Sequence, residues 1–141
     1  MVEKPTFDKV TGSEKFIYGP RKLLLCGFAA SAQPQFETVL GMMGIADMSR
    51  VWVTAGRQQQ TLAELLELAD GSGAGESSTL PRAVIVSGIT EAQLIGLMSM
   101  CKKSGMTQAL WACLTPVSEN WPLQRLLAEL AREREAMQKR K

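Results

Sequence analysis

The sequence contains no histidine, and this absence excludes several kinds of chemistry. Ser-His-Asp and Cys-His catalysis both need an imidazole, and most zinc sites use one as a ligand. Pairs of carboxylates in a pattern suited to acid and base catalysis are also missing. We therefore expect a protein that is not an enzyme and that binds neither a metal ion nor another cofactor.

Long apolar runs are lacking as well. A helix that spans a bilayer needs about 20 consecutive apolar residues, and no segment of this chain approaches that length. The first residues do not contain the apolar core of a signal peptide. The sequence therefore predicts a soluble cytoplasmic protein with no membrane insertion. A location in an organelle matrix or the plastid stroma is the alternative if a targeting peptide has been removed.

Cysteine is scarce, and the three residues Cys26, Cys101 and Cys113 do not form a CxxC pair. Each lies among apolar neighbours, which favours free, buried thiols in a reducing compartment. The alternative is a reactive Cys26, whose thiol pKa would be lowered by a following helix N-terminus.

The net charge is only +2, but it is unevenly distributed. Basic residues outnumber acidic ones in segments 1–22 and 132–141, whereas acidic residues outnumber basic ones in segment 23–131. Basic ends attract nucleic acid or an acidic protein, although charged termini are commonly only solvated.

The chain matches itself without a gap at one constant offset, which places segment 23–69 on segment 84–130. Apolar runs, helical stripes and glycines recur in the same order in both segments. Each unit has the pattern of a β-α-β-α fold. The superposed pairs are Gly27 with Gly88, Gly44 with Gly105, Thr54 with Thr115, Leu62 with Leu123, Leu65 with Leu126, and Leu66 with Leu127.

Local signals locate the elements of each unit. Continuous apolar runs at 23–26 and 83–86 are typical of strands that are buried on both faces. Second strands are expected at 50–54 and 109–114, each with a tryptophan, Trp52 and Trp111, that we assign to the core. Capping boxes that begin at Thr61 and Thr90 predict helix starts.

These patterns predict an α/β fold in which two tandem β-α-β-α repeats share one sheet of about four mostly parallel strands, with helices packed on it. The glycines and serines of Asp70–Ser78 are typical of a flexible linker. The expected parts are an N-terminal arm (1–22), a first repeat (23–69), a flexible linker (70–82), a second repeat (83–131) and a charged C-terminal helix extension (132–141).

The second unit also contains a motif, Leu114-Thr115 followed by Asn120-Trp121-Pro122-Leu123 and then Leu126-Leu127. With the apolar strand that ends at Gly88, this segment resembles a small bacterial family classified as a domain of unknown function. The resemblance covers the C-terminal half and implies no activity. The first unit has Gln59-Gln60 where Asn120-Trp121 stands, so it is expected to be a degenerate copy.

Ligands of open α/β sheets gather beyond the carboxyl ends of the strands, where helix N-termini attract anions. Neither a GxGxxG nor a Walker motif is present to support phosphate binding. The simpler interpretation, which we prefer, is that Thr61, Thr90 and Asn120 only cap helices. The candidate ligand-binding residues at these ends are Gly27, Gly88, Thr54, Arg57, Thr115, Ser118 and Asn120.

The composition favours a protein-interaction or assembly module, including a small subunit of a larger complex. A regulatory domain that binds a small molecule or an anion is one alternative, and nucleic-acid binding through the basic termini is another. The partner is expected to be another protein, contacted by the termini, although the N-terminal arm could instead protect its own sheet edge. The methionines could form an adaptable contact surface or fill gaps in the core. Candidate partner-binding residues are Phe7, Phe16, Tyr18, Arg21, Trp121, Arg134, Lys139 and Arg140.

Overall fold

The computed structural model describes residues 14–106 and 108–139 and contains one four-stranded sheet with the order β2-β1-β3-β4. Strand β1 (Lys22–Cys26) is parallel to β2 (Ser49–Val53), and β3 (Ala83–Ser87) is parallel to β4 (Leu110–Cys113). The two central strands, β1 and β3, are antiparallel. An α/β fold with one mostly parallel sheet is thus confirmed.

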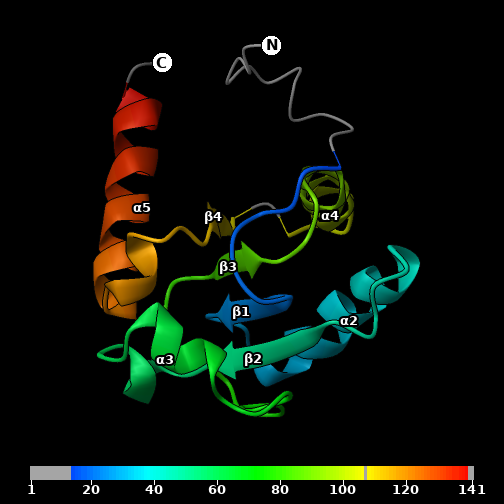
Figure 1. Cartoon of the computed structure of the whole chain (residues 1–141), viewed down its shortest axis with the longest axis horizontal. Helices are drawn as coiled ribbons and strands as arrows, with labels where there is room; N and C mark the ends of the chain where they lie inside the picture. Colours follow the sequence, from blue (N-terminus) through cyan, green and yellow to red (C-terminus); the bar gives the residue numbers. More distant parts are fainter. Residues whose placement is uncertain (1–13, 107, 140–141) are drawn as a thin grey trace.

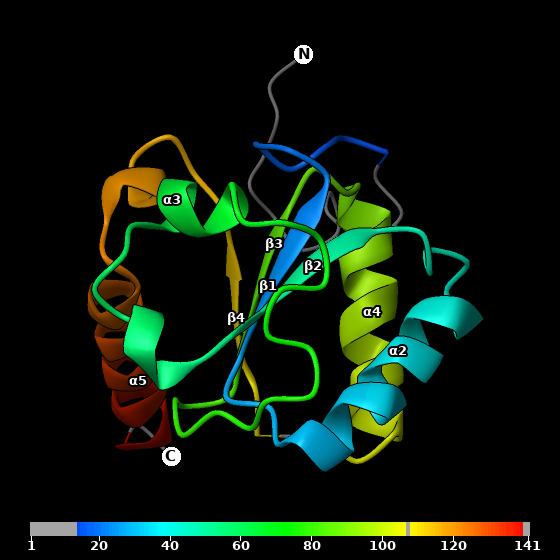
Figure 2. The same ribbon diagram turned by 90° about the horizontal axis from the view of Figure 1, so that it is seen from below.

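Helices cover both faces of the sheet, which gives three layers (Figure 1). Helices α2 (Gln33–Met42) and α4 (Glu91–Lys103) lie on one face, and α3 (Leu62–Leu66) and α5 (Leu123–Lys139) lie on the other, as Figure 2 also shows. Short 3-10 helices, η1 (Ala30–Ala32), η2 (Ala55–Arg57) and η3 (Ser118–Asn120), precede three of these helices.

Two apolar cores separate the layers because successive side chains of a strand point to opposite faces. In β1, Leu23 and Leu25 belong to the core under α2 and α4, whereas Leu24 and Cys26 belong to the core under α3 and α5. This double burial explains why the central strands are apolar throughout. Trp52 is buried as predicted, but Trp111 is only partly buried, because β4 is an edge strand.

The pairing of the two central strands is symmetric. Leu24 lies opposite Ile85, and the neighbouring pairs are Leu23 with Val86 and Leu25 with Val84. A local twofold axis through the pair of Leu24 and Ile85 therefore exchanges β1 with β3. The bounds of these two strands are also related by the same offset that relates segments 23–69 and 84–130 in the sequence.

The segment 70–78, which the sequence predicts to be a flexible linker, lies along the outer edge of β2. Arg50 N donates to Asp70 Oδ1 (2.9 Å), Gly71 N donates to Arg50 O (2.7 Å), and Trp52 N donates to Ser72 O (2.8 Å). The buried Gln33 side chain then binds Glu76 O (3.1 Å) and Gly75 N (2.8 Å). The segment thereby covers one edge of the sheet; its mobility stays a prediction.

Candidate functional site

In the part of the chain that the structure describes, the opposite edge of the sheet, formed by β4, is open along its backbone. Leu110 N donates to Arg82 O and Leu114 N donates to Val86 O, so these residues point their amides towards β3. Because backbone groups alternate in direction along a strand, the N–H and C=O groups of Trp111 and Cys113 point away from the sheet. Within residues 14–106 and 108–139, no further strand pairs with this edge.

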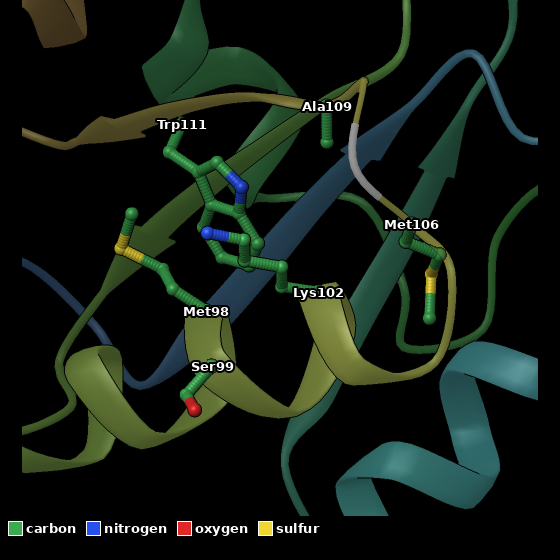
Figure 3. Close-up of a pocket in the computed structure, with 6 residues that line it drawn as sticks. All are labelled: Met98, Ser99, Lys102, Met106, Ala109 and Trp111. Atoms are coloured by element: carbon green, nitrogen blue, oxygen red, sulfur yellow. The ribbon is translucent and has the colours of Figure 1, made fainter.

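Beside this edge, on the face covered by α4, lies a groove of about 460 Å³ (Figure 3). Its wall comes from one side of α4, and the Trp111 side chain projects into it from β4. The side chain of Lys102 extends towards the Trp111 ring. The groove is lined by Met98, Ser99, Lys102, Met106, Ala109 and Trp111.

On the other face, the last turns of α5 extend past β4 on the side away from β3 (Figure 1). The side of α5 that faces the sheet carries Leu123, Leu127 and Leu130, and the same helical spacing continues through Arg134 to Met137. Arg134 donates to Gln108 O (2.9 Å) and Ala109 O (2.8 Å), just before β4. Met137, one turn further on, is 64% exposed.

Among the described residues, the β4 edge therefore has an unpaired backbone, a groove with largely apolar walls and an overhanging helix end with an exposed methionine. Its own side chains, Leu-Trp-Ala-Cys, include none of the lysines or prolines that commonly protect an edge strand from pairing with another chain. The β2 edge, by contrast, is covered by segment 70–78. Chemically, the open edge can accept an added strand.

The residues predicted to bind a ligand do not converge on one end of the sheet. Gly27 and Thr54 follow β1 and β2, whereas Gly88 and Thr115 follow β3 and β4. Because β1 and β3 are antiparallel, the carboxyl ends of the two strand pairs lie at opposite ends of the sheet. The candidate residues are therefore divided between two ends of the sheet, since the sequence does not specify how the two units meet.

Both glycines are needed for the fold. Gly27 has a φ of +76° and Gly88 a φ of +72°, and the backbone of a neighbouring segment crosses directly over each of them. That segment is Leu80–Arg82 at Gly27 and Pro20-Arg21 at Gly88. The crossing backbone leaves no space for a ligand next to either glycine.

The N-termini of α3, α4 and α5 already have hydrogen-bond partners from the chain itself. Thr61 and Thr90 form the predicted capping boxes of α3 and α4. Leu62 N donates to Trp121 O (3.1 Å) and Leu123 N donates to Gln60 O (2.8 Å), so the starts of α3 and α5 bind each other. These N–H groups are therefore not free to bind an anion.

The remaining ligand candidates bond to near neighbours in the sequence. Ser118 N donates to Thr115 Oγ1 (2.9 Å), and Thr115 N donates to Ser118 Oγ (3.1 Å). Arg57 donates to the side chain of Gln60 (2.9 Å) and is exposed. Asn120 is exposed at the end of η3, and Trp121 and Pro122 separate it from α5, so it is not adjacent to the helix it was predicted to cap.

The described part of the N-terminal arm lies against the loop after β3. Ile17 N donates to Ile89 O (2.8 Å), and Gly88 N donates to Ile17 O (3.0 Å). Phe16, which forms a bridge with Thr90, keeps 68% of its surface exposed. Tyr18 is 45% exposed, and its hydroxyl donates to the Glu119 carboxylate (3.1 Å), which raises the Tyr18 pKa.

Three residues predicted to bind a partner, Arg21, Arg134 and Trp121, contact other side chains or backbone groups of the chain itself. Arg21 forms an exposed ion pair with Asp47 (3.3 Å). Arg134, described above, binds two backbone carbonyls. The Arg125 guanidinium lies 3.9 Å from the centre of the Trp121 ring, which is partly buried against the second core. Phe7, Arg140 and the side chain of Lys139 lie outside the described residues.

The described side chains provide no cluster of three or more Cys, Asp or Glu residues that could hold a metal ion. In the same residues, every buried side-chain nitrogen and oxygen has a hydrogen-bond partner. No helix of the described chain has the length and apolar character needed to cross a membrane.

The three cysteines are free, as predicted, but they differ in exposure. Burial raises the pKa of Cys26 to about 12 and that of Cys101 to about 11, which removes the basis for a reactive Cys26. Cys113 is exposed, contrary to the expectation that all three are buried, because it lies at the open edge. Partial desolvation, with a smaller effect of the Glu91 carboxylate, raises its pKa too.

We expect one thiol of the native protein to react with a thiol reagent and two to be protected. Cys113 is accessible, and its reaction should accelerate as the pH rises because the thiolate is the reactive form. Titration with Ellman's reagent, before and after denaturation in urea, measures this. Loss of the fast thiol in Cys113→Ala identifies the residue, and fast reaction of two thiols in the native state would contradict the burial of Cys26 and Cys101.

The fold defines a three-layer α/β protein with helices on both sides of a mixed four-stranded sheet. Residues 82–137 match the model of the family DUF3783, a domain of unknown function, which is consistent with the resemblance of the second half of the chain to an uncharacterised family. The match extends from just before β3 to near the end of α5 and covers less than half of the chain. No curated protein and no solved structure matches the chain.

Proposed function

We propose that this protein is a non-enzymatic interaction module that accepts a β-strand of another polypeptide at its β4 edge. The observation that carries this proposal is the difference between the two sheet edges. Segment 70–78 covers β2, whereas β4 presents the outward backbone groups of Trp111 and Cys113 beside the groove. Strand addition of this kind obtains affinity from backbone hydrogen bonds and specificity from side-chain pockets.

The groove suits an apolar side chain of such a strand. Met98, Met106 and Trp111 supply adaptable apolar walls, and the aliphatic part of Lys102 lies next to them. Lys102 and Lys103 occupy the last turn of α4, so an acidic group at that end of the added strand would be favoured. The proposed partner is thus a protein, in agreement with the expectation from composition.

Cys113→Pro tests this function because it changes the open edge and leaves the internal pairing intact. The Cys113 N–H points outward, so proline removes no hydrogen bond to β3 and is tolerated at such a position. We expect Cys113→Pro to weaken capture of partner proteins from an extract of the source cells at least tenfold. Quantitative mass spectrometry of the recovered proteins measures this.

Cys113→Ala is the matched control, since it removes the same thiol but keeps the backbone N–H. Circular dichroism and thermal melting must show that both variants fold. Recovery of the same proteins, in the same amounts, by the proline variant and the alanine variant would contradict the proposed use of the edge.

We also propose that the chain arose from two copies of one β-α-β-α unit. Support comes from contacts that occur in matched pairs. When each residue is replaced by its counterpart in the other unit, as residue 23 by residue 84, one contact becomes the other. The bond from Leu62 N to Trp121 O has its counterpart in the bond from Leu123 N to Gln60 O. The dipeptides Pro20-Arg21 and Pro81-Arg82 are separated by the same offset, and each crosses over a glycine, Gly88 or Gly27.

A further inference from the structure

We propose that the strand added at the β4 edge comes from a second copy of this chain. The two β4 strands would pair antiparallel, so that two four-stranded sheets join into one continuous sheet across a twofold axis. This inference rests on the proposed function and names the partner of the same edge.

The backbone geometry of β4 is compatible with pairing to itself. A closed dimer presents the same surface on both subunits, and two equal edges related by a twofold axis must run antiparallel. Trp111 and Cys113 each point one donor and one acceptor outward. Each strand therefore offers the alternating donors and acceptors that an antiparallel neighbour needs.

The charges along the edge reverse from one end of β4 to the other. Lys102 lies in the groove beside Ala109 and Trp111, near the start of the strand. Glu91 is the first residue of α4, so it lies at the opposite end of that helix from Lys102. Partial desolvation raises the pKa of the Cys113 thiol, at the end of the strand, and the Glu91 carboxylate contributes to raising it. An antiparallel second copy places its Glu91 on the side of Lys102, and its Lys102 on the side of Glu91. An unrelated strand would carry an acidic group opposite Lys102 and a basic group opposite Glu91 only by chance. A second copy in antiparallel orientation always carries both.

The overhanging end of α5 supplies the second argument for a neighbouring strand. Met137 continues the apolar stripe that packs on the sheet, yet it is exposed because the described chain has no strand beyond β4. A second β4 would lie in that place and cover Met137. Because the arrangement is symmetric, each copy would cover the methionine of the other.

Sedimentation velocity over a range of protein concentrations tests this proposal on the full chain. We expect the unmodified protein to form a dimer, and Cys113→Pro to dissociate at a concentration at least tenfold higher. Met137→Gln should weaken the dimer by a similar factor, because it replaces an apolar contact by a polar one without touching the core. The controls are Cys113→Ala and Met42→Gln, the latter at an exposed methionine of α2, and both should dimerise normally.

A protein that stays monomeric at all concentrations overturns the proposed self-association. If such a monomer still loses captured proteins on Cys113→Pro substitution, the interaction function stands and only the identity of the partner changes. A dimer that is unaffected by both Cys113→Pro and Met137→Gln uses another surface, and it overturns the proposal as well. Should the proline variant fail to fold, the Met137→Gln comparison decides.

Discussion

Gly27→Ala is expected to destabilise the protein by about 2–5 kcal/mol, more than the same change at Gly44. Both glycines have a φ of +76°, so each substitution carries the penalty of a left-handed backbone, roughly 1–2 kcal/mol. A Cβ at position 27 would also lie 2.5 Å from Pro81 O and 2.6 Å from Arg82 N. These are backbone atoms that cannot move aside without displacing β3, which adds about 1–3 kcal/mol or more.

Gly44 is the matched control because a Cβ there would meet no atom within 4 Å. Urea denaturation of the two variants, monitored by circular dichroism, gives the difference in the free energy of unfolding. Equal losses at the two sites would mean that the crossing segment yields to the new methyl group, and the close packing of Leu80–Arg82 on Gly27 would then be contradicted.

This contact illustrates what the sequence predicted and what it did not. The glycines after the central strands were identified as equivalent, because each ends an apolar run at the same offset. Their position after the strands makes them candidates for ligand binding, since loops after parallel strands commonly hold ligands. The repeated Pro-Arg dipeptide, which occurs at Pro20-Arg21 and again at Pro81-Arg82, is the signal that could have indicated a structural role.

Elements set by local signals were predicted well. The capping boxes at Thr61 and Thr90 located the starts of α3 and α4, because the cap is formed between residues close together in the sequence. The central strands followed from their unbroken apolar runs. The structure begins α5 at Leu123, later than a cap at Asn120 would imply, because Asn120 belongs to η3.

The arrangement of the two halves was not predictable from such signals. Each β-α-β unit is closed by local contacts, and nothing within a unit specifies whether β1 meets β3 in a parallel or an antiparallel direction. The antiparallel direction separates the candidate ligand residues. The side-by-side position of β1 and β3 at the centre of the sheet makes β4 an edge. The exposure of Trp111 and Met98 follows from that edge position, so the groove could not be identified from the sequence.

The linker was interpreted from its composition alone. Glycine and serine favour flexibility in a free chain, but Gly71, Gly73 and Gly75 all adopt positive φ values on the edge of β2. Gly73 also approaches the carbonyl of Trp52 so closely that a side chain would collide with it. Glycine here is required by backbone conformation and close approach, which composition cannot distinguish from flexibility.

Phe36→Ala is expected to lower the free energy of unfolding by about 3–5 kcal/mol, the range for a fully buried phenylalanine. Phe36 has no exposed surface, and its ring meets those of Phe28 (5.4 Å between centroids) and Trp52 (6.2 Å) edge to face. Truncation leaves a cavity in the core under α2 and α4 and removes both ring contacts, each of which contributes about 0.5–1.5 kcal/mol beyond burial.

The matched control for this substitution is Phe16→Ala, which removes the same side chain from a position that is 68% exposed. Exposed substitutions of this kind change stability by about 0.5 kcal/mol or less. Urea denaturation followed by tryptophan fluorescence, to which Trp52, Trp111 and Trp121 all contribute, and by far-ultraviolet circular dichroism measures both variants. Because Trp52 packs against Phe36, only Phe36→Ala should also shift the native emission spectrum. Similar losses for Phe16→Ala and Phe36→Ala would show instead that the arm packs as firmly as the core, and that Phe16 contributes to folding of the free chain.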